Sequence, residues 1–367
     1  MKTNVINLLT LPHELIHEIL LRLPVKSLLR FQSVCKSWSS LISDPKFAKF
    51  HFDLAAAPTH KLFVRCSAAA PEVTPIEIET LLHNHSVEAV SSIQLPSSSA
   101  DFKGSCRGFI LLTNTVVAKP DCYFDFVVWN PSTGHRIHKR IINEYIYPYC
   151  GIGYDSSADD YLVVIVNLLL PKKSEQLCTK VDCFSLRTNS WSHVEGTVPY
   201  YHSGDCFTQG TFLNGALHWM VYSDNYDGVI IAFDVRERRW SEIPLPYDLT
   251  NGCKFEIHNL GVMGQCLCLC DCVCDQERFM FSVWTMKKYK VQTSWTKSFV
   301  MYTTNYSFLY RFKPICFTKT GEFFGSGGFH RLLRLNEKGE LLQIYTPEKE
   351  SYFLTWIYRE SLLSLPV

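Results

Sequence analysis

The first fifty residues have apolar side chains at the spacing of helix faces. Between residues 11 and 23, apolar positions recur every three or four residues and form one broad stripe. Pro12 suits the first turn of such a helix, where its missing N–H costs no hydrogen bond, and Pro24 ends it. Two further apolar repeats predict a second short helix near residues 28–31 and a third over about residues 35–42.

This region also has more apolar surface than it can bury. Asp44 can cap a further helical turn, Pro45 fits its first position, and Phe47, Phe50 and Phe52 follow. Three helices of this size cannot cover so much Leu, Ile, Phe and Trp among themselves. The remaining apolar face therefore needs either the rest of the chain or a partner protein, whose share of a standard interface would be roughly 800 Å².

Beyond about residue 100 the pattern changes to short apolar runs separated by turn residues, which is typical of strands. Strand–turn–strand units recur at a period of about 50 residues, the length of a propeller blade. A second hairpin precedes each unit, and the clearest one contains Asn214-Gly215, a dipeptide typical of type I′ turns. The units cover residues 127–136, 181–191, 230–240, 282–289 with Trp295, and 332–342.

Two hairpins per repeat make a blade of four strands, and strands near residues 61–65 and 352–363 are available to close a ring. We therefore expect an α+β multidomain chain: a small three-helix module, then an all-β, kelch-like propeller of about six four-stranded blades. The expected parts are helices over residues 1–50, a connector with a first strand and a Ser/Ala/Pro-rich loop over 51–101, and the propeller over 102–367.

Composition narrows the possible functions. The chain has 367 residues, 47% of them hydrophobic and 14% aromatic, which is ample for a packed core. A formal net charge of +1 offers no global field for nucleic acid or anionic lipid. No apolar run reaches the roughly 20 residues of a membrane span, and no signal-peptide pattern is present. We expect a protein of the cytoplasm or nucleus, whose 15 cysteines are mostly buried thiols.

Residues 13–17 spell His-Glu-Leu-Ile-His, the HExxH pattern of zinc hydrolases. His13 and His17 would bind a zinc ion from successive helix turns, and Glu14 would activate its bound water. The extended form of the motif fails, because leucines occupy the positions of its Gly and third His. We therefore interpret both histidines as solvated positions on the polar face of the helix, and expect neither a metal nor another cofactor.

Five cysteines alternate with other residues from Cys266 to Cys274. This spacing places all five on one face of an extended strand, whereas zinc sites use convergent pairs supplied by turns. Leu267, Leu269 and Val273 occupy the other face. We interpret the segment as a strand packed on both sides, with metal binding and redox sensing as the alternatives.

The N-terminal pattern resembles an F-box of the plant type. The likeness runs through Leu11-Pro12, Glu14-Leu15-Ile16, Leu23-Pro24-Val25-Lys26-Ser27-Leu28-Leu29-Arg30-Phe31, Val34-Cys35-Lys36-Ser37-Trp38 and Leu41-Ile42. In that family the motif docks on the Skp-family adaptor of a cullin–RING ubiquitin ligase. The resemblance implies adaptor contact for Leu11, Pro12, Leu15, Ile19, Leu20, Leu23, Pro24, Leu28, Val34, Trp38 and Ile42.

The remainder resembles the F-box-associated, kelch-like domain of plant F-box proteins. The markers are Val128-Trp129-Asn130-Pro131-Ser132-Thr133-Gly134, Gly153-Tyr154-Asp155, Ser185-Leu186-Arg187-Thr188-Asn189-Ser190-Trp191 and Gly210-Thr211-Phe212-Leu213-Asn214-Gly215. Pollen S-locus F-box proteins share this layout, but no residue assigns the chain to that subgroup. The resemblance implies a non-catalytic substrate receptor that joins a target protein, through the adaptor, to cullin and RING subunits for ubiquitination. The alternatives are a propeller scaffold with a non-functional F-box and a zinc hydrolase.

One rim of such a propeller carries the loops between blades, and in this chain those loops are rich in tyrosine. Tyrosine supplies a large contact area and a hydroxyl group at low entropic cost, so we hypothesise that this rim holds the target. Alternatively, many of these rings pack between blades. The opposite rim is short and charged. The candidate target-binding residues are Tyr145, Tyr147, Tyr149, Tyr200, Tyr201, His202, Tyr302, Tyr306, Phe308 and Tyr310.

Overall fold

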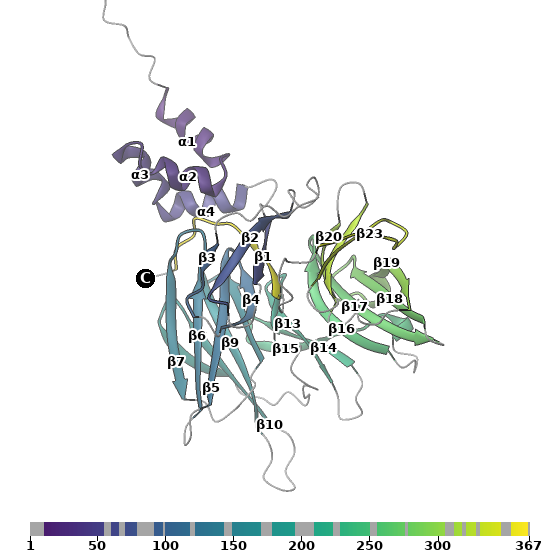
Figure 1. Ribbon diagram of the computed structural model, residues 1–367. Coiled ribbons are helices and arrows are strands. Elements are labelled where there is room, and N and C mark those ends of the chain that lie inside the picture. Colours follow the sequence, from purple (N-terminus) through teal and green to yellow (C-terminus); the bar gives the residue numbers. More distant parts are fainter. Residues whose placement is uncertain are drawn as a thin grey trace, which may run out of the picture.

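In a computed structural model, four helices precede a ring of six four-stranded sheets, as Figure 1 shows. This confirms the expected helical module and six-bladed propeller. The structure describes residues 11–54, 60–65, 70–78, 92–97, 100–117, 122–142, 149–169, 178–194, 209–222, 228–249, 255–275, 278–304, 312–317, 321–327, 331–345 and 354–365.

The helical module contains one helix more than the three predicted. It consists of α1 (His13–Leu21), α2 (Val25–Phe31), α3 (Lys36–Ile42) and α4 (Pro45–Leu54). The restart predicted at Asp44 is a full helix, and the Lys46 N–H donates to Asp44 Oδ1 at 2.7 Å, as expected of a cap. The buried face of α4 carries Phe47, Ala48 and Phe52 and belongs to one apolar core shared with the propeller.

Each blade runs from an innermost to an outermost strand, in antiparallel order. Blade 1 consists of β24 (Leu354–Arg359), β1 (His60–Arg65), β2 (Glu72–Glu77) and β3 (Ile93–Gln94). Blade 2 contains β4 (Asp101–Cys106), β5 (Phe109–Val117), β6 (Cys122–Trp129) and β7 (Arg136–Ile142). Blade 3 contains β8 (Tyr149–Asp155), β9 (Asp160–Leu169), β10 (Cys178–Ser185) and β11 (Ser190–Val194).

The second half of the ring repeats this plan. Blade 4 contains β12 (Thr211–Leu213), β13 (Ala216–Tyr222), β14 (Gly228–Asp234) and β15 (Arg239–Ile243). Blade 5 contains β16 (Phe255–Met263), β17 (Cys266–Asp275), β18 (Arg278–Met286) and β19 (Trp295–Thr303). Blade 6 contains β20 (Lys313–Phe317), β21 (Phe323–Gly327), β22 (Arg331–Leu335) and β23 (Leu341–Tyr345). Short 3₁₀ turns follow β15 and β18, at Tyr247–Leu249 and Gln292–Ser294.

Blade 1 is built from both ends of the chain. Strand β24 pairs antiparallel with β1, from His60 opposite Arg359 to Arg65 opposite Leu354. The C-terminal strand is therefore the innermost strand of the blade, and the chain after α4 supplies the outer three. This confirms the two strands predicted to close the ring. The segment 51–101, expected as a connector with a first strand, contains the end of α4, strands β1–β3 and the start of β4.

The inner strands of blades 2, 3 and 4 approach one another closely at Gly210. Its N–H donates to both the Lys103 carbonyl at 3.0 Å and the Cys150 carbonyl at 2.8 Å. A Cβ atom on Gly210 would lie 2.8 Å from the Cα atom of Gly151. Only glycine fits so close a backbone contact. In the hairpin that follows, Asn214 and Gly215 have φ values of 50° and 77°, as the predicted type I′ turn requires.

Strand β17 carries the cysteine row and is packed on both faces, as predicted. Cys268, Cys270 and Cys272 lie in the core between blades 5 and 6, while Leu267 and Leu269 lie in the core between blades 4 and 5. Burial raises the pKa of the Cys268 thiol to about 12 and raises that of Cys270 as well, so both remain protonated.

The turn between β6 and β7 anchors the C-terminal tail. Asn130 is fully buried, and its Nδ2 donates to the carbonyls of Ser361 at 3.1 Å and Leu363 at 2.8 Å and lies 3.1 Å from the Ser361 hydroxyl. The tail after β24 is therefore held on the rim of blade 2. There Leu362, Leu363 and Leu365 join the core beneath the helical module (Figure 1).

Replacing Asn130 by alanine leaves buried carbonyl oxygens without a donor. We expect Asn130→Ala to lower the free energy of unfolding by about 3 kcal/mol in a urea titration. His135→Ala changes an exposed side chain in the same turn and should cost less than about 0.5 kcal/mol. Equal effects of the two changes would contradict the anchoring role of Asn130.

A buried histidine joins blades 4 and 5. The ring of His218 is wholly buried; its Nδ1 lies 3.0 Å from the Thr211 carbonyl and its Nε2 lies 2.7 Å from the Tyr289 hydroxyl. A neutral imidazole satisfies both contacts by donating from Nδ1 and accepting at Nε2. Burial lowers the pKa of His218 to about 4, so the ring stays neutral in the folded protein at physiological pH.

The lowered pKa of His218 predicts acid sensitivity. An unfolded histidine binds its proton near pH 6.5, so the stability that His218 contributes is complete above that pH and is lost as the pH falls towards 4. Between pH 7 and pH 5 we expect the parent to lose about 2 kcal/mol more unfolding free energy than His218→Gln. Asp271, whose pKa burial raises to about 6, shifts stability in the opposite sense but is present in both proteins. Parallel pH profiles would refute the prediction.

Candidate functional site

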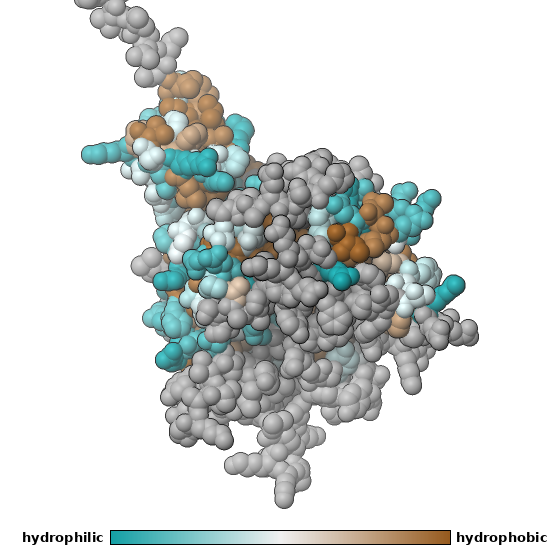
Figure 2. All heavy atoms as spheres, viewed as in Figure 1, coloured by the Kyte–Doolittle hydropathy of each residue, from teal (hydrophilic) through white to brown (hydrophobic). Residues whose placement is uncertain are grey.

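An exposed apolar stripe runs along α1. Leu11, Leu15 and Ile19 follow one another at intervals of one helix turn and are 55%, 50% and 48% exposed. Val34, in the turn after α2, is also exposed. Figure 2 shows a hydrophobic surface at the outer end of the helical module, where α1 lies in Figure 1. Exposed apolar side chains gathered in this way are typical of a protein-docking surface.

The residues predicted to contact an adaptor divide into two sets. Leu20, Leu28 and Ile42 are buried in the core shared by the helices and the propeller, so they support the surface from beneath and do not form it. On α1 the apolar stripe includes the buried Leu20 beside the exposed Ile19, because the helix packs one side against the module while the neighbouring side stays exposed. The accessible set is Leu11, Pro12, Leu15, Ile19, Pro24 and Val34, with Leu23 and Trp38 half-buried at its margin.

The HExxH residues do not converge on a metal site. His13 and Glu14 are exposed at the start of α1, as expected. His17 is half-buried, and its ring meets the edge of Phe47 at 5.5 Å between centroids, so the prediction that it is solvated is wrong. Among the residues that the structure describes, no group of three His, Cys, Asp or Glu side chains lies close enough to hold a metal ion.

Helix α4 fixes the module to the propeller through the ring of Phe52. The guanidinium group of Arg359, at the end of β24, lies over this ring at 3.6 Å from its centroid, and that of Arg107 lies over it at 4.6 Å. Arg359 also donates to the Phe52 carbonyl, and Arg107 pairs with Asp53 at 3.2 Å. Two partly buried cations thus hold one aromatic ring, each cation–π contact contributing about 1 kcal/mol.

A surface ion pair adds a second point of contact, between Lys49 Nζ and Asp159 Oδ1 at 3.1 Å. The Tyr154 hydroxyl, which also donates to this carboxylate, and Lys49 hold the pKa of Asp159 below its usual range. Arg107 lies in the β4–β5 turn and Asp159 in the β8–β9 turn. Both turns belong to the rim expected to be short and charged, and the helical module occupies that rim over blades 2 and 3.

Family comparison agrees with the two-part architecture. Residues 8–50 match the F-box domain, and residues 71–354 match the F-box associated beta propeller domain. The chain belongs to the F-box proteins with an F-box-associated propeller. The helical module is therefore the F-box, and its pairing with a propeller is the layout of a substrate adaptor.

Curated relatives match this chain over most of their length. The F-box protein CPR1 of Arabidopsis thaliana is 29% identical over 320 residues, which cover 80% of this chain and 73% of that protein. An F-box/kelch-repeat protein of the same plant is 30% identical over 307 residues, which cover 78% of each chain. No described helix of this F-box protein is long and apolar enough to cross a membrane.

The tyrosine rim lies mostly outside the described residues. Tyr149 is described and is 2% exposed, in the core between blades 3 and 4, where burial raises its pKa. This corrects its assignment to a target-binding surface, because every residue of β8 is buried. Tyr302 is described and is 69% exposed on β19. The predicted residues outside the described part are Tyr145, Tyr147, Tyr200, Tyr201, His202, Tyr306, Phe308 and Tyr310.

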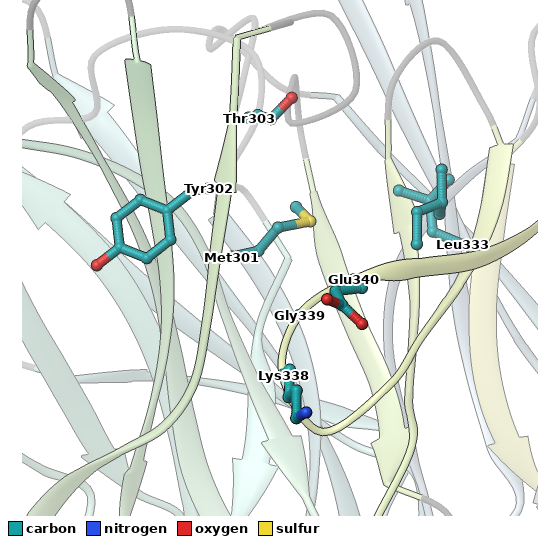
Figure 3. A pocket seen from close by; sticks show the side chains of 8 residues that line it. Met301, Tyr302, Thr303, Leu333, Lys338, Gly339 and Glu340 are labelled. Carbon is teal, nitrogen blue, oxygen red and sulfur yellow. The ribbon is translucent and has the colours of Figure 1, made fainter.

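A shallow pocket of about 340 Å³ lies beside Tyr302, between β19 and the β22–β23 turn. In Figure 3, Met301 points towards Leu333 and Glu340, while the ring of Tyr302 points to the other side of β19. Gly339, with φ of +80°, brings the turn so close that a Cβ atom there would lie 2.4 Å from the Val300 carbonyl oxygen. The pocket mixes apolar and charged lining and indicates no particular ligand.

The contacts of the Phe52 ring predict that this side chain stabilises the attachment of the F-box to the propeller. Phe52→Ala removes a buried ring, so we expect a loss of about 3 kcal/mol of unfolding free energy and faster amide exchange in α4 than in the blades. Phe50 provides a matched control, because it lies on the same helix and is 58% exposed. Phe50→Ala should change stability by less than about 0.5 kcal/mol. Equal exchange of α4 in the two variants would rule out the mounting role of Phe52.

Proposed function

We propose that this F-box protein is the substrate-recognition subunit of an SCF-type ubiquitin ligase. Its F-box would dock on a Skp-family adaptor, which joins it to cullin and RING subunits, and its propeller would hold a target protein for ubiquitination. The exposed face of Leu11, Leu15, Ile19 and Val34 is the observation that carries this proposal. The family resemblance supports the choice of partner, and the complex would act in the cytoplasm or nucleus.

Apolar burial would supply most of the docking energy. Leu15 and Ile19 lie one turn apart near the middle of the stripe, and each is about half exposed in the chain alone. Fully burying such a side chain contributes roughly 2 kcal/mol. The polar side of α1 has an ion pair between Glu18 and Arg22 at 3.2 Å, with both side chains largely exposed, and such a pair adds little.

The contacts of α4 with the propeller fix the position of the F-box, and this matters for the proposed function. A target bound to the propeller is held at a set position relative to the F-box, because Phe52 and Lys49 join α4 to the turns of blades 2 and 3. Catalysis at the distant end of the ligase would then depend on proximity, with target lysines held near the ubiquitin donor. On this proposal no residue of this chain performs chemistry.

The target-binding face remains a proposal of its own. The F-box lies on the rim that carries the β4–β5 and β8–β9 turns, and we propose that the opposite rim, with the loops between blades, contacts a target. Tyr302 and the tyrosines outside the described residues belong to that proposal.

Adaptor binding tests the function directly. We expect Leu15→Asp combined with Ile19→Asp to weaken binding to a purified Skp-family adaptor at least roughly hundredfold, because two apolar anchors are lost. Leu342→Asp, at a 49% exposed leucine of β23 in blade 6, is the control and should leave the affinity unchanged. Thermal unfolding of each variant checks that the fold is intact. Retained binding in the double variant, or no binding by the parent, would overturn the proposal.

A further inference from the structure

Strand β7 differs from the other outermost strands in its charge. Its seven residues include Arg136, His138, Lys139 and Arg140, and His135 precedes them. The other outermost strands, β3, β11, β15, β19 and β23, carry at most one lysine or arginine each. Figure 2 shows hydrophilic side chains along the edge of the molecule where β7 lies in Figure 1.

The register of β7 against β6 separates these side chains by face. Arg136, His138 and Arg140 lie opposite Trp129, Val127 and Asp125, and so project from the face turned towards blade 1. Lys139 projects from the other face, where its ammonium group lies 5.4 Å from the centroid of the Phe184 ring in blade 3. The cations therefore line both faces of an edge strand that pairs with β6 alone among the described strands.

A groove of about 360 Å³ opens on the Arg136 face. It runs between the end of β3 and blade 2, with Pro96 and Ser97 on one side, Arg136 and His138 on the other, and the buried Thr113 in its lining. An extended segment laid along β7 would place every second side chain at this groove, because strand side chains alternate between faces.

The charge at this groove is only partly compensated. Arg140 donates to both oxygens of Asp125, at 2.8 and 3.0 Å, and holds the pKa of that carboxyl below its usual range. Asp125 also lies 3.6 Å from His138 Nε2. It is the one carboxylate within ion-pairing distance of β7 in the described part of the chain. Arg140 is therefore neutralised, whereas Arg136 and Lys139 add net positive charge to the strand.

We propose that β7 and its groove bind an acidic, extended segment of a protein, which adds to blade 2 as a fifth strand. Acidic side chains at alternate positions would face Arg136 and His138, and apolar ones between them would face Ile137 and Ile141. Opposite charges across a strand pair stabilise pairing, while the backbone of the edge strand supplies hydrogen bonds. This inference names the chemical class of target and rests on the proposed receptor function.

Charged edge strands also protect sheets from unwanted pairing. That role requires only charge at the edge, and lysine or glutamate serves it equally. It accounts neither for the single sign of charge on β7 nor for the groove beside it. The two explanations differ in whether an acidic peptide binds here.

The test uses the full chain and a fluorescent decapeptide of alternating glutamate and valine. At low salt we expect saturable binding, at least tenfold weaker in Arg136→Glu and weakened by added salt because exposed charges are screened. Arg239→Glu makes the same change at an exposed residue of β15 and should leave binding unchanged. A peptide of alternating glutamine and valine should bind at least tenfold more weakly than the acidic one.

Four outcomes would overturn the inference: no binding of the acidic peptide, equal binding of the glutamine peptide, equal loss in Arg239→Glu, or equal affinity for an oligouridylate, which would indicate a general anion surface. The adaptor assay separates this inference from the receptor function. Arg136→Glu should keep full adaptor affinity, and the variant with Leu15→Asp and Ile19→Asp should keep full peptide affinity. Each proposal can therefore fail while the other stands.

Discussion

The pairing of β24 with β1 is the interaction on which the rest of the structure depends. In this propeller the first and last strands share a blade, and a six-residue antiparallel ladder there joins residues nearly 300 positions apart. Closure brings residues 60–65 and 354–359 to one place on the ring. Helix α4 precedes β1, and the tail that follows β24 passes beneath the helices. The F-box lies over blades 2 and 3, next to the blade in which the ring closes, and Arg359 of β24 contacts its Phe52.

This arrangement explains why Arg359 and Asn130 have structural parts beyond their own strands. Arg359 ends β24, pairs across the ladder with His60, and lies over the ring of Phe52. Asn130 holds the tail that continues from Arg359, through contacts with the Ser361 and Leu363 carbonyls. The tail and the F-box share one core with blades 2 and 3, and Arg359 connects the F-box to the closing ladder through the ring of Phe52.

The apolar surface that the helices cannot bury among themselves divides into two parts, one covered by the propeller and one left exposed. Phe52 of α4 is covered by Arg107 and Arg359 of the propeller, whereas Leu11, just before α1, and Leu15 and Ile19 on it remain exposed. One side of the F-box is thus used to fix its position, and the other is available to a partner. This division matters for a receptor. A target bound to the propeller has a defined position relative to the adaptor only if the F-box keeps a fixed orientation on the propeller.

Local sequence was sufficient for three of the four helices, for the blades and for their repeat. The type I′ hairpin at Asn214-Gly215, the doubly packed cysteine strand and the two strands that close the ring all follow from short-range patterns. Periodicity reports that a side chain needs cover, because burial repeats with the geometry of the helix or strand. It does not report which surface provides the cover.

Only the tertiary structure decided which surface covers each apolar side chain. Ile19 and Leu20 are neighbours in one apolar stripe, yet Ile19 is half exposed and Leu20 is buried. The sequence places Tyr149 among surface tyrosines, but it lies between blades, and His17 packs on Phe47. Each outcome depends on residues distant in sequence, as does the contact between Phe52 and Arg359, 307 positions apart. Such contacts form only when the ring closes, which is why the sequence by itself determined the parts and the closed fold determined their exposed faces.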